Sequence, residues 1–287
     1  MSQSQGSVEI AGASLNYAVE GKGLPLLVVG SSIYYPRTFS KRLRESCTLI
    51  CADLPHFVPV SAKFDPACIS FDFYSECIEA IRADVGLGRV VVVGHSHHGN
   101  IALEYARRHP DRVSHIVLIG SPPADIAVTV EHAEQYWSTH ASAERQAALQ
   151  RRRRTTAEEE GGSLSPSESY VRQYVTDAPL YWNDPDYDAS WLWEGMSFSM
   201  EAVHAFRNLY RSYELNWDIA VRGRPVLVAM GANDFAVPHT LWSKVLPHLN
   251  NVAFRLLERS GHTPQLEQPE EFDDVLISWL NSERVQE

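Results

Sequence analysis

The sequence predicts an α/β fold in which helices cover both faces of a mostly parallel, doubly wound sheet. Short apolar runs recur along the chain, helical patterns lie between several of them, and one run ends in a sharp turn at Ser96. Continuous apolar runs are typical of strands that are buried on both faces, as in a parallel sheet. The alternation of strand and helix therefore favours this fold class over an all-helical or all-β one.

Eight segments are predicted as strands. The first two form a hairpin around Ala11-Gly12-Ala13, and the other six are short apolar runs. The predicted strands are residues 8–10, 15–19, 25–29, 48–52, 89–93, 113–119, 226–230 and 252–257. The helices predicted between and after them are residues 73–85, 97–108, 240–246 and 270–280.

The alternation stops after Ile119 and resumes at Arg224. Residues 122–220 between them are expected to be helical and rich in loops, and they carry five of the seven tryptophans. We therefore expect a core of residues 1–121 and 221–287, with a helical cap inserted after the sixth strand. The aromatic side chains of a small cap can form its own core and also line a pocket that faces Ser96.

Charge and composition narrow the class of partner. The chain has 287 residues, 44% of them hydrophobic and 21% charged, which is ordinary for a globular enzyme. Its formal net charge of −11 argues against nucleic acid and anionic membranes as partners. The basic residues 151–154 run into the acidic residues 158–160, so we expect a solvated helix end there.

Several kinds of site and segment are not indicated. No apolar run reaches the ~18 residues that a membrane span needs, and residues 1–7 lack the pattern of a secretion signal, so we expect a cytoplasmic protein. Cys47, Cys51, Cys68 and Cys77 have no C-x-x-C spacing and are expected to be free thiols. No nucleotide-binding glycine motif is present, and no carboxylate cluster accompanies His56, His95, His97 and His98. We therefore expect a small-molecule substrate and neither a cofactor nor a metal, while a homodimer stays open.

The segment 94–99, Gly-His-Ser-His-His-Gly, is the strongest functional signal. A strand that breaks into a helix at a serine is the form of a nucleophile elbow, in which the strained serine presents its hydroxyl at a helix N-terminus. The helix dipole and the free N–H groups there favour developing negative charge. His98 occupies the position that is usually glycine in G-x-S-x-G. It either fills a small gap, tunes Ser96 or marks a distorted elbow.

Two further residues have the types and positions that a serine nucleophile needs. A serine hydroxyl requires a base, and a histidine base requires an acceptor that fixes its tautomer. Asp234 follows the predicted strand 226–230, and His262 follows the last predicted strand after Gly261, which permits a tight turn. Sites in open α/β sheets gather at such carboxyl ends of strands. The order Ser96, Asp234, His262 therefore indicates a catalytic triad.

On these residues the chain resembles the α/β-hydrolase fold family over nearly its whole length. The resemblance implies an oxyanion hole made by the backbone N–H groups of Ser31 and His97. The family often has His-Gly at the end of the third strand, whereas this chain has Val29-Gly30, so the support around these amides must differ. Asp53 matches a structural aspartate of the family that holds a loop.

Two segments are similar to proline-iminopeptidase-like members of that family. They are residues 30–37 and Trp193-Glu194-Gly195. The similarity implies that Tyr34, Trp193 and Glu194 contact substrate. Those relatives hold a free amine with cap carboxylates, for which Glu194 and Glu201 are the candidates here.

The sequence thus predicts a serine hydrolase for a small or medium apolar ester, lactone or amide. Ser96 attacks the carbonyl carbon, His262 transfers the proton, and Asp234 orients His262. An aminopeptidase of the proline-releasing kind is one alternative. Others are acyl transfer, C–C cleavage or a lyase reaction on the same scaffold, and a ligand-binding receptor that retains the triad. A serine nucleophile argues against epoxide and halide hydrolysis, for which relatives use aspartate.

Overall fold

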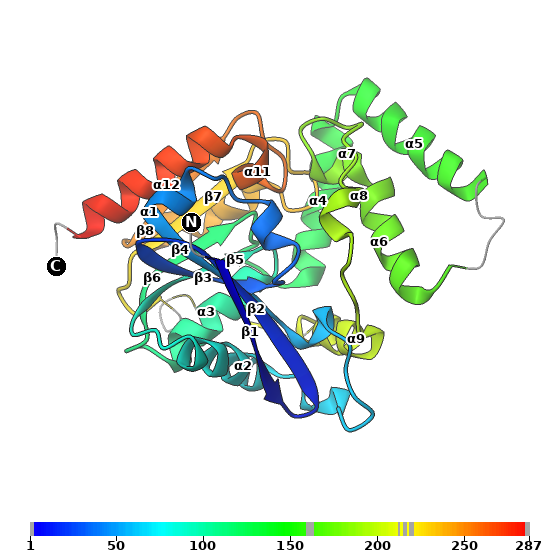
Figure 1. Ribbon diagram of the computed structural model, residues 1–287. Coiled ribbons are helices and arrows are strands. Elements are labelled where there is room, and N and C mark those ends of the chain that lie inside the picture. The colour runs from blue at the N-terminus through cyan, green and yellow to red at the C-terminus, as the bar shows by residue number, and fades with distance from the viewer. Residues whose placement is uncertain (1–2, 159–163, 212, 215–216, 218–220, 285–287) are drawn as a thin grey trace.

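An eight-stranded sheet forms the centre of the molecule (Figure 1), in the order β1-β2-β4-β3-β5-β6-β7-β8. The computed structural model describes residues 3–158, 164–211, 213–214, 217 and 221–284. β2 pairs antiparallel with β1 and β4, and the remaining pairs are parallel. The predicted fold class is therefore confirmed. The strands are β1 (Gln3–Ile10), β2 (Ala13–Gly21), β3 (Leu24–Gly30), β4 (Cys47–Asp53), β5 (Val90–His95), β6 (Val113–Ile119), β7 (Val226–Gly231) and β8 (Val252–Leu257).

Helices cover both faces of the sheet, which explains the continuous apolar runs. In β3, Leu27 and Val29 belong to one core cluster, while Leu26 and Val28 belong to the cluster on the opposite face. The first cluster includes side chains of α2 and α3, and the second includes side chains of α1 and α12. Burial of each such Val or Leu contributes about 1.5–3 kcal/mol. The helices outside the insertion are α1 (Leu43–Ser46), α2 (Phe71–Asp84), α3 (His98–Arg108), α11 (Pro264–Glu267) and α12 (Pro269–Arg284).

Short 3₁₀ turns connect several of these elements, and one of them differs from the sequence prediction. Residues 240–246, expected as an α-helix, form the turn η4 and the start of η5. Pro247 follows directly, and a proline disfavours the α-helical conformation of the residue before it, so one continuous α-helix up to Leu246 is disfavoured. The turns are η1 (Tyr35–Arg37), η2 (Pro55–Phe57), η3 (Pro66–Cys68), η4 (His239–Lys244) and η5 (Leu246–His248).

The segment between β6 and β7 is helical, and its described residues contain no strand. In Figure 1 most of its helices lie to one side of the sheet. Residues 159–163, which include the acidic residues 159–160 of the expected solvated helix end, lie outside the described residues. The helices are α4 (Ile126–His140), α5 (Ala143–Glu158), α6 (Pro166–Thr176), α7 (Ala178–Tyr181), α8 (Ser190–Trp193) and α9 (Met200–Leu209).

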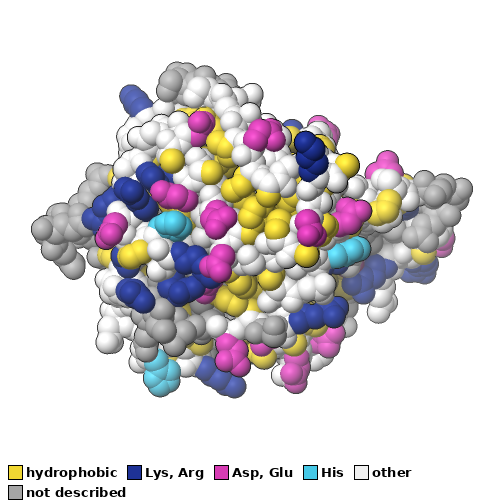
Figure 2. Space-filling model, turned by 90° about the horizontal axis from the view of Figure 1, so that it is seen from below, with side chains coloured by type: hydrophobic (Ala, Val, Ile, Leu, Met, Phe, Trp, Pro, Cys, Tyr) yellow, Lys and Arg dark blue, Asp and Glu magenta, His cyan; other side chains and the backbone are white. Residues whose placement is uncertain are grey.

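Surface charge, helix length and the cysteines bear on the expectations from composition. Basic and acidic side chains are interspersed on the face that Figure 2 shows. No helix within the described ranges has both the length and the apolar character that crossing a bilayer requires. The four cysteines are free thiols.

Candidate active site

Ser96 lies in a strained turn between β5 and α3. Its φ angle is +55°, a region that residues with a side chain rarely occupy. The turn is tight because glycines flank it: a Cβ atom on Gly94 would lie 2.5 Å from the Cα atom of Gly99, and one on Gly99 would lie 2.2 Å from Ser121 Oγ. Ser96 N–H donates to the carbonyl of Ile119 in β6, at 2.8 Å. The local geometry is therefore that of a nucleophile elbow.

His98 is buried beside this turn and does not occupy the site of close approach. Its Nδ1 lies 2.9 Å from Tyr35 Oη, and its Nε2 lies 3.1 Å from His56 Nε2. Gly99, one residue later, makes the close contact that a small residue normally makes at the elbow. The contacts favour the interpretation that His98 fills a gap next to the turn.

A neutral chain of hydrogen bonds runs through His98. His56 Nδ1 lies 2.9 Å from Tyr74 Oη, so both ring nitrogens of His56 and both of His98 have partners. Burial lowers the pKa of His56 to about 3 and lowers that of His98 well below its ordinary value. Both rings therefore stay uncharged at neutral pH and occupy fixed positions.

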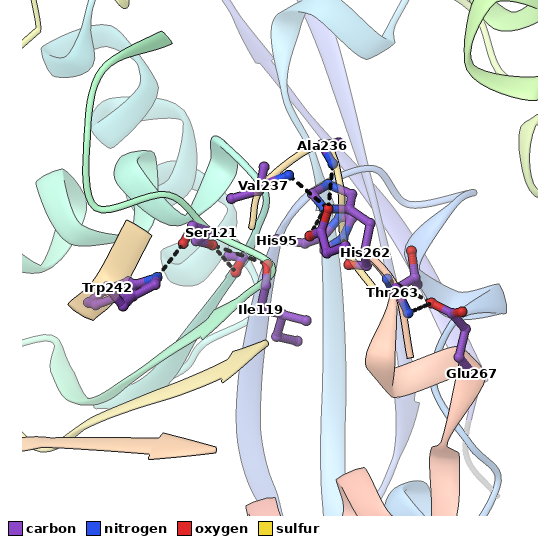
Figure 3. Close-up of polar contacts among 12 residues, drawn as sticks. His95, Ile119, Ser121, Ala236, Val237, Trp242, His262, Thr263 and Glu267 are labelled. Atoms are coloured by element: carbon purple, nitrogen blue, oxygen red, sulfur yellow. Dashed lines mark hydrogen bonds and ion pairs between the residues drawn. The ribbon is translucent and has the colours of Figure 1, made fainter. Parts of the chain in front are cut away.

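Asp234 and His262 form a buried pair. His262 Nδ1 donates to Asp234 Oδ2 at 2.7 Å, while the amides of Ala236 and Val237 donate to Oδ1 at 3.0 and 2.8 Å. Figure 3 shows these amides and the His262 ring converging. Asp234 is fully buried, so three directed hydrogen bonds replace its hydration. Because Nδ1 carries the proton, Nε2 of a neutral His262 ring is free to accept one.

His95 connects the elbow to the loop of His262. The backbone carbonyl of His262 accepts a hydrogen bond from His95 Nε2 at 2.8 Å (Figure 3), and the two rings are 4.6 Å apart. Burial lowers the pKa of His95 to about 3. The neutral ring therefore carries its proton on Nε2 and has Nδ1 free as an acceptor toward Tyr35 Oη, 3.4 Å away.

Ser96 and His262 line one cavity of about 130 Å³. Within the described part of the chain, the Ser96 hydroxyl forms no hydrogen bond with His262; such contacts often tighten only when substrate binds. The other lining residues are mostly aromatic or histidine side chains. They are Tyr34, Tyr35, His56, Phe57, His95, His97, His98, Tyr170, Tyr174, Tyr181, Trp182, Ala189, Trp193, Met196, Phe206 and Thr263.

The amides predicted to form the oxyanion hole have free donors. Ser31 is buried just after β3, and its Oγ accepts from the amides of Ile33 and Tyr34, both at 3.1 Å. Neither the Ser31 amide nor the His97 amide donates to another residue in the described ranges. Asp53 Oδ1 accepts the adjacent Ser32 amide at 2.5 Å, which is the loop-holding contact expected of it.

The predicted substrate-binding residues separate into two groups. Tyr34 and Trp193 line the cavity with their ring centroids 5.0 Å apart. Glu194 and Glu201 are exposed and do not line it. No Asp, Glu, Lys or Arg is among the described residues that line this cavity. The structure therefore does not bring the expected cap carboxylate to the site.

Two residues that bind the backbone next to Ser96 and His262 were not predicted as site residues from the sequence. Tyr210 Oη donates to the His97 carbonyl at 2.7 Å, next to the elbow. Glu267 accepts from the amides of Gly261 and Thr263, on either side of His262. Its position five residues after His262 was a usable signal, whereas nothing near Tyr210 in the sequence points to the elbow.

The chain matches the family model described as alpha/beta hydrolase fold over residues 23–269. It is 29% identical over 276 residues to the AB hydrolase superfamily protein YclE of Bacillus subtilis (strain 168), which covers 94% of this chain and 96% of that protein. It is 24% identical over 272 residues to a proline iminopeptidase of Lacticaseibacillus rhamnosus (strain Lc 705), which covers 89% of each.

Solved structures show the same fold at low sequence identity. A thermophilic esterase from Thermogutta terrifontis has a TM-score of 0.69 at 20% identity, covering 96% of this chain and 98% of that one. A meta-cleavage product hydrolase from Pseudomonas fluorescens IP01 has a TM-score of 0.68 at 18% identity, covering 96% and 97%. At these identities the likeness concerns the fold alone.

Proposed function

The chain belongs to the alpha/beta hydrolase fold family, and from this premise we propose that it is a serine hydrolase with the triad Ser96, Asp234 and His262. The observation that carries the proposal is the 2.7 Å hydrogen bond between His262 and the buried Asp234, at the cavity that Ser96 also lines. Hydrolase relatives and the strained φ angle of Ser96 support it. Its substrate is a small or medium apolar ester, lactone or amide.

In the first half of the reaction, Ser96 Oγ forms a bond to the carbonyl carbon of the substrate. His262 Nε2 takes the hydroxyl proton as that bond forms, and Asp234 stabilises the resulting imidazolium. When the tetrahedral intermediate collapses, the bond to the leaving alcohol or amine breaks, and His262 returns the proton to it. The acyl group remains on Ser96.

In the second half, water replaces the leaving group. His262 removes a proton from the water molecule as its oxygen bonds to the acyl carbon, and then protonates Ser96 Oγ as the ester bond breaks. The amides of Ser31 and His97 donate to the negatively charged oxygen in both halves. Removal of one such donor typically costs about 10²–10³ in rate.

We propose that residues 122–220 act as a cap on a core formed by residues 1–121 and 221–287. Tyr170, Tyr174, Tyr181 and Trp193 of this segment line the cavity together with residues of the core. Aromatic side chains and the absence of charge among the described lining residues favour a neutral, apolar substrate group.

A proline-releasing aminopeptidase is the second candidate, because a proline iminopeptidase is among the relatives. An enzyme that binds a free ammonium group needs a carboxylate or another anion beside it. The described lining residues include none, so the ester, lactone or neutral amide reading is preferred.

Labelling with a fluorophosphonate, followed by mapping of the modified peptide, tests the proposed function. The expected result is covalent modification of Ser96, together with turnover of simple apolar esters. Ser96→Ala should remove both, with Ser75→Ala as a control that changes a buried serine outside the cavity. An unlabelled wild-type protein without turnover would indicate a binding protein.

A further inference from the structure

Residues 179–183 of the inserted segment lie between the loop of Asp234 and the loop of His262. The carbonyl of Leu180 accepts from the amides of Phe235 and Ala236, at 2.9 and 3.1 Å. The carbonyl of Tyr181 accepts from the amide of His262, at 2.5 Å. Adjacent carbonyls of one short segment thus bind the backbone beside both members of the acid–base pair.

The packing around this segment is tight. A Cβ atom on Gly261 would lie 2.2 Å from the carbonyl oxygen of Tyr181 and 2.9 Å from Trp182. The glycine before His262 is therefore required by this close approach, because the segment leaves no room for a side chain. The inserted segment and the His262 loop fit together as one unit at this point.

Arg145 of α5 contacts the same segment through three backbone carbonyls. Its guanidinium donates to the carbonyls of Pro179 and Trp182, both at 2.8 Å, and of Asn183 at 2.6 Å. It also lies over the ring of Phe235, 5.0 Å from the ring centre. Arg145 is buried, so its hydrogen bonds to three carbonyls replace the water it has lost.

Glu267 of α11 completes the arrangement. Its Oε2 accepts from the amide of Asn183 at 2.7 Å, and its Oε1 accepts from the amides of Gly261 and Thr263 at 2.9 and 3.2 Å (Figure 3 shows the contact with Thr263). The carboxylate therefore contacts the backbone on both sides of His262 and the end of residues 179–183. Burial raises the pKa of Glu267, and the amides that donate to it oppose this shift.

We propose that Arg145 and Glu267 are positioning residues that use residues 179–183 as a brace to set the geometry of the Asp234–His262 pair. The inference rests on the proposed function and deepens it: the inserted segment shapes the cavity and also supports the catalytic base. Neither residue lines the cavity, so each acts through its contacts with the brace and with the loops of Asp234 and His262. Tyr181 and Trp182 of the brace do line it, so a substrate in the cavity would contact the brace directly.

The test compares Arg145→Met and Arg145→Lys with a matched control on the same helix. Arg152 of α5 also donates to carbonyls, those of Val175 and Thr176 at the end of α6, at 2.8 and 3.2 Å. These carbonyls do not contact either triad loop. Arg152→Met thus removes an arginine–carbonyl contact of the same kind without touching the brace.

We expect Arg145→Met to lower kcat for an apolar ester about 10–100-fold, with KM changed less than threefold, since small displacements of catalytic groups reduce rate by about this much. The pH dependence of kcat should also shift, because the geometry of the base changes. Arg145→Lys should recover part of the loss, Glu267→Gln should lower kcat about tenfold, and Arg152→Met should leave kcat and the pH profile within twofold. Folded Arg145→Met with wild-type kcat and pH profile would overturn the proposal.

A second measurement does not depend on turnover. The proton between His262 Nδ1 and Asp234 Oδ2, which are 2.7 Å apart, is expected to give a far-downfield ¹H NMR signal in the wild type. If the proposal is right, this signal is lost or shifted in Arg145→Met and Glu267→Gln and is unchanged in Arg152→Met. An unchanged signal in the two brace variants overturns the proposal even if the wild type hydrolyses no ester. If Arg145→Met does not fold, Arg145→Lys and Glu267→Gln decide the question by the same readings.

Discussion

The carbonyl of His262 accepts a hydrogen bond of 2.8 Å from the ring of His95, the residue directly before Ser96. One bond thus joins the nucleophile turn to the loop that carries the proposed base. His95→Phe keeps an aromatic ring but removes the donor and leaves a buried carbonyl without its partner. We expect a loss of about 1–3 kcal/mol in the free energy of unfolding, measured by urea denaturation. A stability equal to that of the wild type would show that this bond contributes nothing.

Asp234→Asn should preserve the shape of the site and impair the base. The single carbonyl oxygen of asparagine can still accept from the amides of Ala236 and Val237, but its NH₂ group then faces His262 Nδ1. An NH₂ group cannot accept the Nδ1 proton, so the tautomer with the proton on Nε2 becomes favourable and His262 can no longer accept a proton there. We expect kcat/KM for an apolar ester to fall about 10³–10⁴-fold, while circular dichroism stays unchanged. Asn233→Ala, which changes the neighbouring side chain, is the control and should keep activity within threefold. A loss of less than tenfold in Asp234→Asn would contradict the assigned role.

His98→Gly should affect stability more than rate. The substitution removes a buried ring and leaves Tyr35 Oη and His56 Nε2 each without one partner. We expect about 2–4 kcal/mol of destabilisation and a change in kcat below fivefold. A folded His98→Gly protein that loses most of its rate would instead indicate that His98 tunes Ser96.

Stability should fall as the pH is lowered from about 6.5 toward 3. Burial lowers the native pKa of His56 and of His95 to about 3, whereas a histidine in the unfolded chain has its ordinary value of 6.5. Between these values the unfolded state binds protons that the native state does not, so acid favours unfolding. Each group then contributes about 1.4 kcal/mol per pH unit.

Urea midpoints at pH 7, 6 and 5 check this dependence. A His56→Gln variant separates the contribution of His56 from those of the other titrating groups. Its free energy of unfolding should fall less steeply with decreasing pH than that of the wild type, by about 1.4 kcal/mol per pH unit. Parallel pH curves for the variant and the wild type would show that His56 is not neutral in the native state.

Substrate charge provides another test. Because no charged side chain is found among the described residues of the cavity lining, a free amine on the substrate should hinder binding. We expect apolar acyl esters to be cleaved at least about tenfold more efficiently than prolyl esters or arylamides, and N-acetylation of the proline to raise kcat/KM. Prolyl turnover that disappears on acetylation would favour the aminopeptidase.

Local patterns were sufficient for most of the fold. Leu26, Leu27, Val28 and Val29 are all buried, on alternate faces of the sheet, so the strand is apolar throughout, as expected of a strand covered on both faces. The α-helix expected at residues 240–246 was wrong: the chain forms two 3₁₀ turns there, and Pro247 disfavours an α-helical conformation at the residue before it. The predicted carboxylate Glu194 does not line the cavity: it follows the last residue of α8 and is exposed, and the sequence of the insertion does not reveal which side chains of this short helix face the core.

By itself, the sequence determined the succession of the strands, the helices α2, α3 and α12, the turn at Ser96 and the candidates Asp234 and His262. These features depend on residues adjacent in the chain, where glycine, proline and apolar periodicity act directly on the backbone. Only the tertiary structure decided that His98 bonds to Tyr35 and His56, and that Arg145 and Glu267 bind the backbone of residues 179–183 next to the loops of Asp234 and His262. Such contacts join residues far apart in sequence, so they exist only after the sheet and the inserted segment have packed.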